Sequence, residues 1–168
     1  MRMVIVRETR RLLLTPSAPL HARQYGTSFL NQLVLNRKYD RELARMLIDT
    51  YLSLFKVQIA LGDVEQRVLA GLLTGVLRAL PYAEFSAEEA VSTESPLSEH
   101  VDTLYRIAHV ANFSASVQAM TLLFQISGLQ KVTLDRFLRL LYDSLSWRAV
   151  GTTSKPGLYL NLIYRVSV

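Results

Sequence analysis

The segment HVANFSASVQAMTLLFQIS, residues 109–127, decides how the chain folds. It contains the end of one helix, a turn around Asn112, and a second helix over 115–127 for which Ser114 is the expected cap. The second helix is apolar on almost every face, and such a helix needs neighbours on several sides to bury it. The segment therefore predicts the interior of a stack of helices, in which polar side chains serve packing and not chemistry.

Helical periodicity extends along the whole chain, and no segment alternates like a β-strand. Small polar residues and glycine mark the expected helix ends: Gly62 ends the third helix, and Asp63, with Gln66, caps the fourth. Thr133 and Ser154 are the expected caps of the seventh and eighth helices. The eight expected helices cover 2–14, 19–35, from the NRKYD turn (36–40) to about 61, 64–80 before Pro81, 96–110, 115–127, 134–146 and 155–168.

A weak internal repeat connects these helices. SFLNQLVLNR (28–37) is similar to LYLNLIYRVS (158–167). Aligning Asn31, Thr74, Leu122 and Asn161 gives steps of 43, 48 and 39 residues. Helix pairs that recur at intervals of about 40–47 residues are typical of HEAT and armadillo arrays. We therefore predict an all-α, HEAT/armadillo-like α-solenoid of four helical hairpins, formed by residues 1–168 as a single segment.

Charge is distributed unevenly along the chain. The net charge is +5, but residues 83–102 carry six acidic and no basic residues, so the remainder carries +11. A basic body of this kind attracts polyanions. Residues 83–97 are expected to form an acidic, flexible inter-helix loop; a regulatory segment and an intramolecular mimic of phosphate are the alternatives. The chain has no cysteine, which excludes disulfides and thiolate metal sites.

Basic side chains gather in the first half of the chain. Arginines at 37, 41 and 45 recur at helical spacing and are expected to share one helix face. Such a face could neutralise phosphates, or it could be a solvated face on which Glu42 and Asp49 pair with Arg45. The candidate RNA or phosphate contacts are Arg10, Arg11, Arg37, Lys38, Arg41 and Arg45.

Nothing in the sequence predicts catalysis, a metal site or a cofactor. The three histidines lie outside any HExxH or metal-binding carboxylate pattern, and no GxSxG or glycine-rich phosphate loop is present. Amide side chains that interrupt the apolar helices can bond across helix–helix seams or hold a partner. We expect the seam role for Gln118, which lies seven residues from Gln125 on one helix face. Both roles stay open for Asn31 and Asn161.

The order and spacing of several short motifs resemble the CCAAT-binding factor (CBF) domain family of nucleolar complex and maintenance-of-killer proteins. The motifs extend over nearly the whole chain. They are FLNQLVL (29–35), LLTGV (72–76), DTLY (102–105), HVxNF (109–113), SVQA (116–119), LLFQ (122–125) and LNLIY (160–164).

The resemblance implies a non-catalytic α-solenoid scaffold in nucleolar assembly of the large (60S) ribosomal subunit, without a cofactor. It implies localisation in the nucleolus and nucleus. It also implies two partners, another nucleolar solenoid protein of the same class and the pre-ribosomal particle with its rRNA. No membrane is expected, because Arg, Asn, Gln or Asp interrupts every apolar stretch before 18 residues. Members of the family are several hundred residues long, so we expect a middle piece of a longer solenoid, whose open ends favour self-association.

Two other functions are compatible with a helical repeat. An armadillo-type peptide-binding or nuclear transport adaptor would need regularly spaced Trp-Asn pairs, whereas the chain has one tryptophan, Trp147, followed by Arg148. A DNA-associated transcription factor module is the third reading, although no helix-turn-helix, zinc or leucine-zipper pattern supports it.

Overall fold

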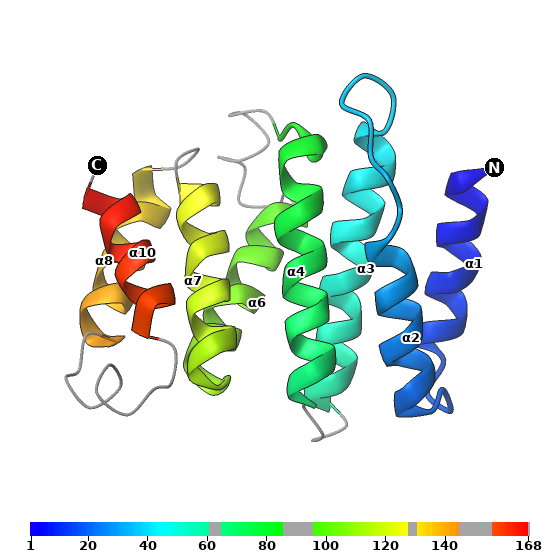
Figure 1. The fold of residues 1–168 in the computed structure, drawn as a ribbon, viewed down its shortest axis with the longest axis horizontal. Helices are drawn as coiled ribbons and strands as arrows, with labels where there is room; N and C mark the ends of the chain where they lie inside the picture. Colours follow the sequence, from blue (N-terminus) through cyan, green and yellow to red (C-terminus); the bar gives the residue numbers. More distant parts are fainter. Residues whose placement is uncertain (61–64, 86–95, 128–130, 145–155, 168) are drawn as a thin grey trace. The chain divides into compact units, whose positions relative to one another are not determined.

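The computed structural model describes residues 1–60, 65–85, 96–127, 131–144 and 156–167 (Figure 1). Within these ranges it contains eight helices and no β-strand, so the predicted all-α class is confirmed. No helix in this part of the chain is both long and apolar enough to cross a membrane. The chain divides into two compact units, Met1–Phe85 and Ser86–Val168.

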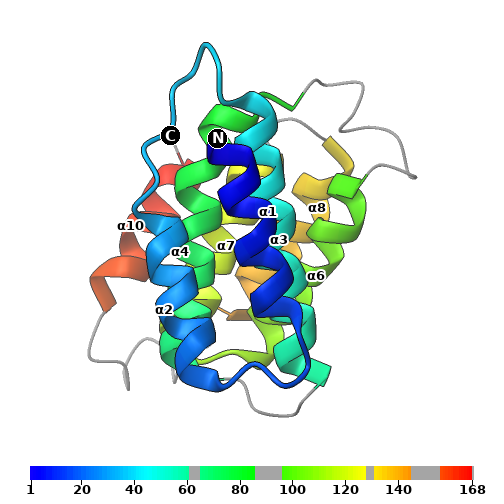
Figure 2. The same cartoon turned by 90° about the vertical axis from the view of Figure 1, so that its right-hand side faces the viewer.

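The first unit consists of two stacked helical hairpins. Helices α1 (Arg2–Leu14) and α2 (Leu20–Asn31) form one hairpin, and α3 (Arg41–Ala60) and α4 (Gln66–Ala83) form the other. Helix α1 packs on α3 and α2 packs on α4, so the hairpins form two layers (Figure 2). This is the packing expected of neighbouring HEAT-like repeats.

In the second unit α7 (Phe113–Ser127) is the central helix. It packs against α6 (Pro96–Val110), α8 (Lys131–Ser144) and α10 (Pro156–Ser167). Ala119, Leu122 and Leu123 on α7 are fully buried. The prediction that this apolar helix needs neighbours on several sides is therefore confirmed.

Helix α10 is anchored by a buried tyrosine. Tyr159 is fully buried, and its hydroxyl lies 2.7 Å from Ser144 Oγ and donates to the carbonyl of Leu141 at 3.1 Å. Its ring packs against that of Phe113, with 5.8 Å between the centroids. These contacts hold α8, α7 and α10 together around one polar group that is satisfied within the core.

Two helices of the first unit end at residues other than those predicted from the sequence. Helix α2 stops at Asn31 and not at residue 35, because the Arg78 side chain donates to the carbonyls of Asn31 and Leu33. Helix α4 continues through Pro81 to Ala83. Proline removes one backbone donor, and only Tyr82 and Ala83 follow it in the helix, so few residues depend on the interrupted turn. The carbonyls after it are satisfied by arginine side chains from α3, as shown below.

Two predicted caps in the second unit are wrong. The cap of α7 is Asn112, whose Oδ1 accepts a hydrogen bond from the Ala115 N–H at 2.9 Å, so Ser114 lies inside the helix. Asparagine is among the strongest N-caps, and its bond reaches the third helical residue in the usual way. Helix α8 begins at Lys131, so Thr133 is inside it; a cap needs extended backbone, and the backbone there is helical.

Other predicted features fall wholly or partly outside the described residues. Gly62, Asp63 and Ser154 are among them; Glu65, which precedes α4, makes no side-chain cap bond. Of the predicted 83–97 loop, Ala83 belongs to α4, and Pro96 and Leu97 begin α6. Residues 86–95, which carry most of its charge, lie outside the described residues.

Candidate nucleic-acid interface

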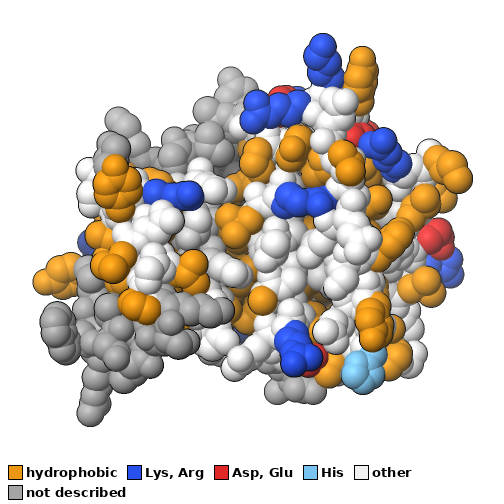
Figure 3. Space-filling view, viewed as in Figure 1, with side chains coloured by type: hydrophobic (Ala, Val, Ile, Leu, Met, Phe, Trp, Pro, Cys, Tyr) orange, Lys and Arg blue, Asp and Glu red, His pale blue; other side chains and the backbone are white. Residues whose placement is uncertain are grey.

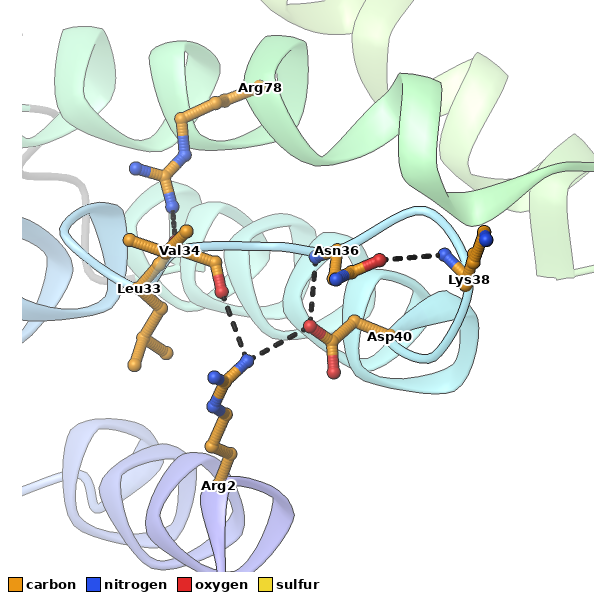
Figure 4. A network of polar contacts seen from close by, with 7 residues as sticks. All are labelled: Arg2, Leu33, Val34, Asn36, Lys38, Asp40 and Arg78. Atoms are coloured by element: carbon orange, nitrogen blue, oxygen red, sulfur yellow. Dashed lines mark hydrogen bonds and ion pairs between the residues drawn. The ribbon is translucent and has the colours of Figure 1, made fainter.

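The connection between α2 and α3, residues 32–40, is held by arginines from two other helices (Figure 4). Arg78 of α4 binds the carbonyls at its start, as described above. Arg2 of α1 donates to the Val34 carbonyl at 3.3 Å and forms an ion pair with Asp40 Oδ2 at 3.0 Å. Side chains from α4 and α1 thus fix the two ends of this connection.

The connection also carries internal hydrogen bonds. Asp40 Oδ2 accepts from the Asn36 N–H at 2.9 Å, and Asn36 Oδ1 accepts from the Lys38 N–H at 3.0 Å. The Asp40 N–H returns to the Asn36 carbonyl, also at 3.0 Å. Asn and Asp side chains that bond the backbone two to four residues away stabilise tight turns. The loop is therefore ordered by its own residues as well as by its neighbours.

The tip of this loop exposes two cations and an aromatic ring. Arg37 and Lys38 are exposed, and Tyr39 is 82% exposed. Basic and apolar side chains both project at this end of the first unit in Figure 3. Within the described part of the chain, the side chains of these three residues make no hydrogen bond or ion pair. They are available to a ligand.

Arg41 and Arg45, predicted as phosphate contacts, bind the end of α4. Arg41 Nη2 donates to the Glu84 carbonyl at 2.9 Å, and Arg45 donates from Nε to the Ala83 carbonyl at 3.0 Å and from Nη2 to Glu84 at 3.2 Å. They satisfy carbonyls that have no partner within α4 and place positive charge at its negative end. Arg45 also lies over the Phe85 ring.

The predicted arginine face is therefore not a single surface. Arg37 precedes α3 and lies in the loop, so its expected place on one helix face with Arg41 and Arg45 is wrong. The helix begins only at Arg41, because Asn36 and Asp40 favour the turn. Arg10 forms an ion pair with Asp49 that joins α1 to α3, while Arg11 is exposed at the end of α1.

Asn31 lies at a seam between helices. Its Nδ2 donates to the Gly71 carbonyl at 2.9 Å, which joins α2 to α4. Its Oδ1 is buried without a hydrogen-bond donor among the described residues. A Cβ placed on Gly75 would lie 2.5 Å from Asn31 Oδ1 and 2.5 Å from Tyr51 Cζ, so glycine permits this close approach. Burial raises the pKa of Tyr51, and the nearby Arg78 charge partly opposes the rise.

The other three amides differ in their surroundings. Gln118 is half-buried, and its Oε1 has no donor within the described part of the chain. Gln125 is exposed. Gln118 and Gln125 were predicted to lie on one helix face, but they differ in burial. Asn161 is exposed on α10. Among the described residues, Asn31 is the only one of these four amide side chains that forms a hydrogen bond between two helices.

The sequence interpretation missed three residues of this region. Tyr39 had a signal, since it follows two cations in a polar turn. Arg2 and Arg78 had none, because their acceptors lie 32 and 47 residues away in the chain. No group of three or more potential metal-binding side chains occurs among the described residues.

Comparison with known proteins supports the family resemblance. Residues 116–168 match the CBF/Mak21 family. The chain is 38% identical over 165 residues to mouse "CCAAT/enhancer-binding protein zeta", an alignment that covers 98% of this chain. It is 32% identical to "Ribosome biogenesis protein NOC1" of Chaetomium thermophilum, with 93% of this chain covered. It is 30% identical to "Nucleolar complex protein 1" of Drosophila melanogaster, with 96% covered.

The resemblance to the CBF family is thereby confirmed. The matched region is a small part of each relative: 15% of the mouse protein, 18% of the Chaetomium protein and 14% of the Drosophila protein.

Proposed function

We propose that this chain acts in ribosome biogenesis as a non-catalytic scaffold segment in nucleolar assembly of the large ribosomal subunit, binding protein partners and pre-ribosomal RNA. The observation that carries the proposal is the similarity over nearly the whole chain to a protein named for ribosome biogenesis. Nucleolar localisation agrees with the name of the Drosophila relative. Stacked helical hairpins with apolar side chains exposed on their surfaces suit a scaffold.

Exposed apolar side chains support the protein-binding part of the proposal. In the first unit α1 and α2 expose Leu12 (70%) and Tyr25 (72%). In the second, α8 and α10 expose Tyr142 (78%) and Tyr164 (69%). The expected partner is another nucleolar helical-repeat protein, and the same surfaces would support self-association of the isolated chain.

The exposed basic loop between α2 and α3 supports the RNA-binding part. Neutralising phosphates releases counterions, so binding should weaken steeply as salt rises. A titration of labelled structured RNA with the chain, at several salt concentrations, tests this. Absence of binding at the lowest salt would remove RNA from the proposal and leave protein scaffolding.

Affinity purification of the full-length protein tests the cellular role. We expect pre-ribosomal RNA and a second helical-repeat nucleolar protein to co-purify, the latter also after RNase treatment. Recovery of neither would contradict the proposal. Because the mouse relative is named a CCAAT/enhancer-binding protein, a CCAAT duplex DNA belongs in the same binding assays. Preference for that DNA over RNA would favour the transcription factor alternative.

A further inference from the structure

We propose that the tip of the α2–α3 loop, residues 34–39, binds single-stranded RNA, with Tyr39 stacking on an unpaired base and Arg37 and Lys38 contacting the flanking phosphates. The proposal rests on the RNA-binding part of the proposed function and adds the site and the class of RNA.

The position of Tyr39 favours contact with a ligand. A tyrosine that is 82% exposed contributes little to the core. Its backbone N–H bonds the Asn36 carbonyl at 3.4 Å, within the loop that Arg2 and Arg78 fix. Stacking on an aromatic ring is the common way to bind a base without reading its sequence. Because the backbone is already ordered, binding would cost little further chain entropy.

The space next to Tyr39 is large enough for a base. A cavity of about 420 Å³ lies between the start of α1, the loop and the start of α3. Tyr39 forms part of its wall, together with the apolar Met3 and Leu43. The remaining wall includes the ion-paired Arg2 and Asp40, and the acidic Glu42. This volume is within the range of small-molecule sites. A base stacked on Tyr39 therefore has room beside the ring.

The charge around the tip of the loop favours phosphates. Arg37, Lys38 and Arg41 follow one another closely, and the acids in the same stretch are Asp40 and Glu42. Asp40 is neutralised by its ion pair with Arg2. The local balance remains positive, so the phosphates on either side of a stacked base would be attracted.

Duplex RNA would not use this site. Bases inside a duplex are stacked on each other and present no free face to an aromatic side chain, whereas loops, bulges and single strands do. The site therefore predicts a preference for single-stranded over double-stranded RNA that depends on the Tyr39 ring.

Fluorescence anisotropy with the 168-residue chain tests the proposal. The probes are a labelled single-stranded RNA of about 12 nucleotides, within the usual site size of such proteins, and the duplex of the same sequence. Tyr39→Ala should weaken single-strand binding by roughly 5- to 160-fold, which corresponds to the loss of about 1–3 kcal/mol for one stacking partner, and leave duplex binding unchanged. Tyr39→Phe keeps the ring and should bind as the unmodified chain does.

Two further variants separate stacking from charge. The double variant Arg37→Ala, Lys38→Ala should reduce the steepness with which the affinity for single-stranded RNA falls with salt. The slope of log affinity against log salt concentration should decrease by roughly 1.4, or about 0.7 for each phosphate that is no longer neutralised. Tyr39→Ala should leave that slope unchanged. The matched control is Tyr25→Ala, which removes another exposed tyrosine of the same unit, 72% exposed on α2. Tyr25 belongs to the proposed protein-binding surface and not to the loop, so this variant should leave the affinity for single-stranded RNA unchanged. Thermal unfolding should be the same for all these exposed-site variants.

The outcomes distinguish the inference from the proposed function. If the chain binds single-stranded RNA and Tyr39→Ala binds equally well, the loop site is wrong and RNA binding stands. If the chain binds neither RNA at low salt, the RNA part of the proposed function is wrong, and the inference with it. If Tyr39→Ala loses a protein partner but keeps its RNA affinity, the tip is a protein contact and the inference is overturned.

Discussion

Substituting Gly75 by alanine should destabilise the first unit, although alanine is the better helix former. The added methyl would lie 2.5 Å from both Asn31 Oδ1 and Tyr51 Cζ. Neither neighbour can move away easily. The Asn31 amide is bonded to the Gly71 carbonyl at 2.9 Å, and the Tyr51 side chain is 1% exposed within the core. The clash must therefore be relieved by a shift of α2 or α3 against α4.

Two opposing effects set the size of the change. Forcing an extra methyl into a packed core costs about 1–3 kcal/mol. Replacing glycine by alanine inside a helix stabilises by about 1 kcal/mol. With obstacles on two sides the steric cost should be near the top of its range, which leaves a net loss of about 1–2 kcal/mol. In a chain of this size that lowers the unfolding temperature by about 2–4 °C per kcal/mol.

Two other glycines provide matched controls. A Cβ on Gly71 would meet Thr27 Cγ2 at 3.3 Å, a tight contact but not an impossible one, so Gly71→Ala should be nearly neutral. A Cβ on Gly157 would meet nothing within 4 Å, so Gly157→Ala should be neutral or slightly stabilising. Urea unfolding followed by far-UV circular dichroism measures all three. If Gly75→Ala is as stable as Gly71→Ala, the account of the α2–α4 seam is refuted.

Four other changes have defined outcomes. Asn112→Ala removes the cap of α7 and should lower the free energy of unfolding by about 1 kcal/mol, whereas Ser114→Ala should change it little. Urea unfolding measures both variants, and equal effects would support Ser114 as the cap, as predicted from the sequence. Glu84→Gly should raise the unfolding temperature, since Glu84 has φ 43° and a left-handed non-glycine residue is strained by about 1–2 kcal/mol; a lower temperature would show that its side chain matters. Because burial raises the pKa of Tyr51, the folded state holds that proton more tightly than the unfolded state. Stability should therefore be unaffected below the ordinary tyrosine pKa of about 10 and fall as pH rises above it, less steeply in Tyr51→Phe. Deleting residues 86–95 removes acidic charge while keeping the Glu84 carbonyl that Arg41 and Arg45 bind, and should tighten RNA binding if the acidic loop mimics phosphate; unchanged affinity at matched salt would exclude that role.

Local patterns predicted which segments are helical, whereas contacts between distant residues are found where α2 and α4 end. The turn before α7 was visible from local spacing, although its capping residue was assigned two positions too late. The ends of α2 and α4 could not be predicted in the same way. Arg78 reaches α2 from 47 residues away, and Arg41 reaches α4 from 43 residues away, so no local window contains both donor and acceptor.

These arginines also explain why the positions of basic residues in the sequence predicted only part of the candidate interface. The C-termini of α2 and α4 both lack a glycine cap, and each is closed by arginine side chains of a neighbouring helix: Arg78 for α2, and Arg41 and Arg45 for α4. Guanidinium groups suit this task because several donors lie in one plane. A guanidinium that binds such carbonyls is held in one direction and is less free to follow a phosphate. The loop cations Arg37 and Lys38 bind no helix end and are exposed. Arg37, Arg41 and Arg45 have helical spacing in the sequence, but they serve two different purposes. Arg41 and Arg45 cap a helix, whereas Arg37 belongs to an exposed surface.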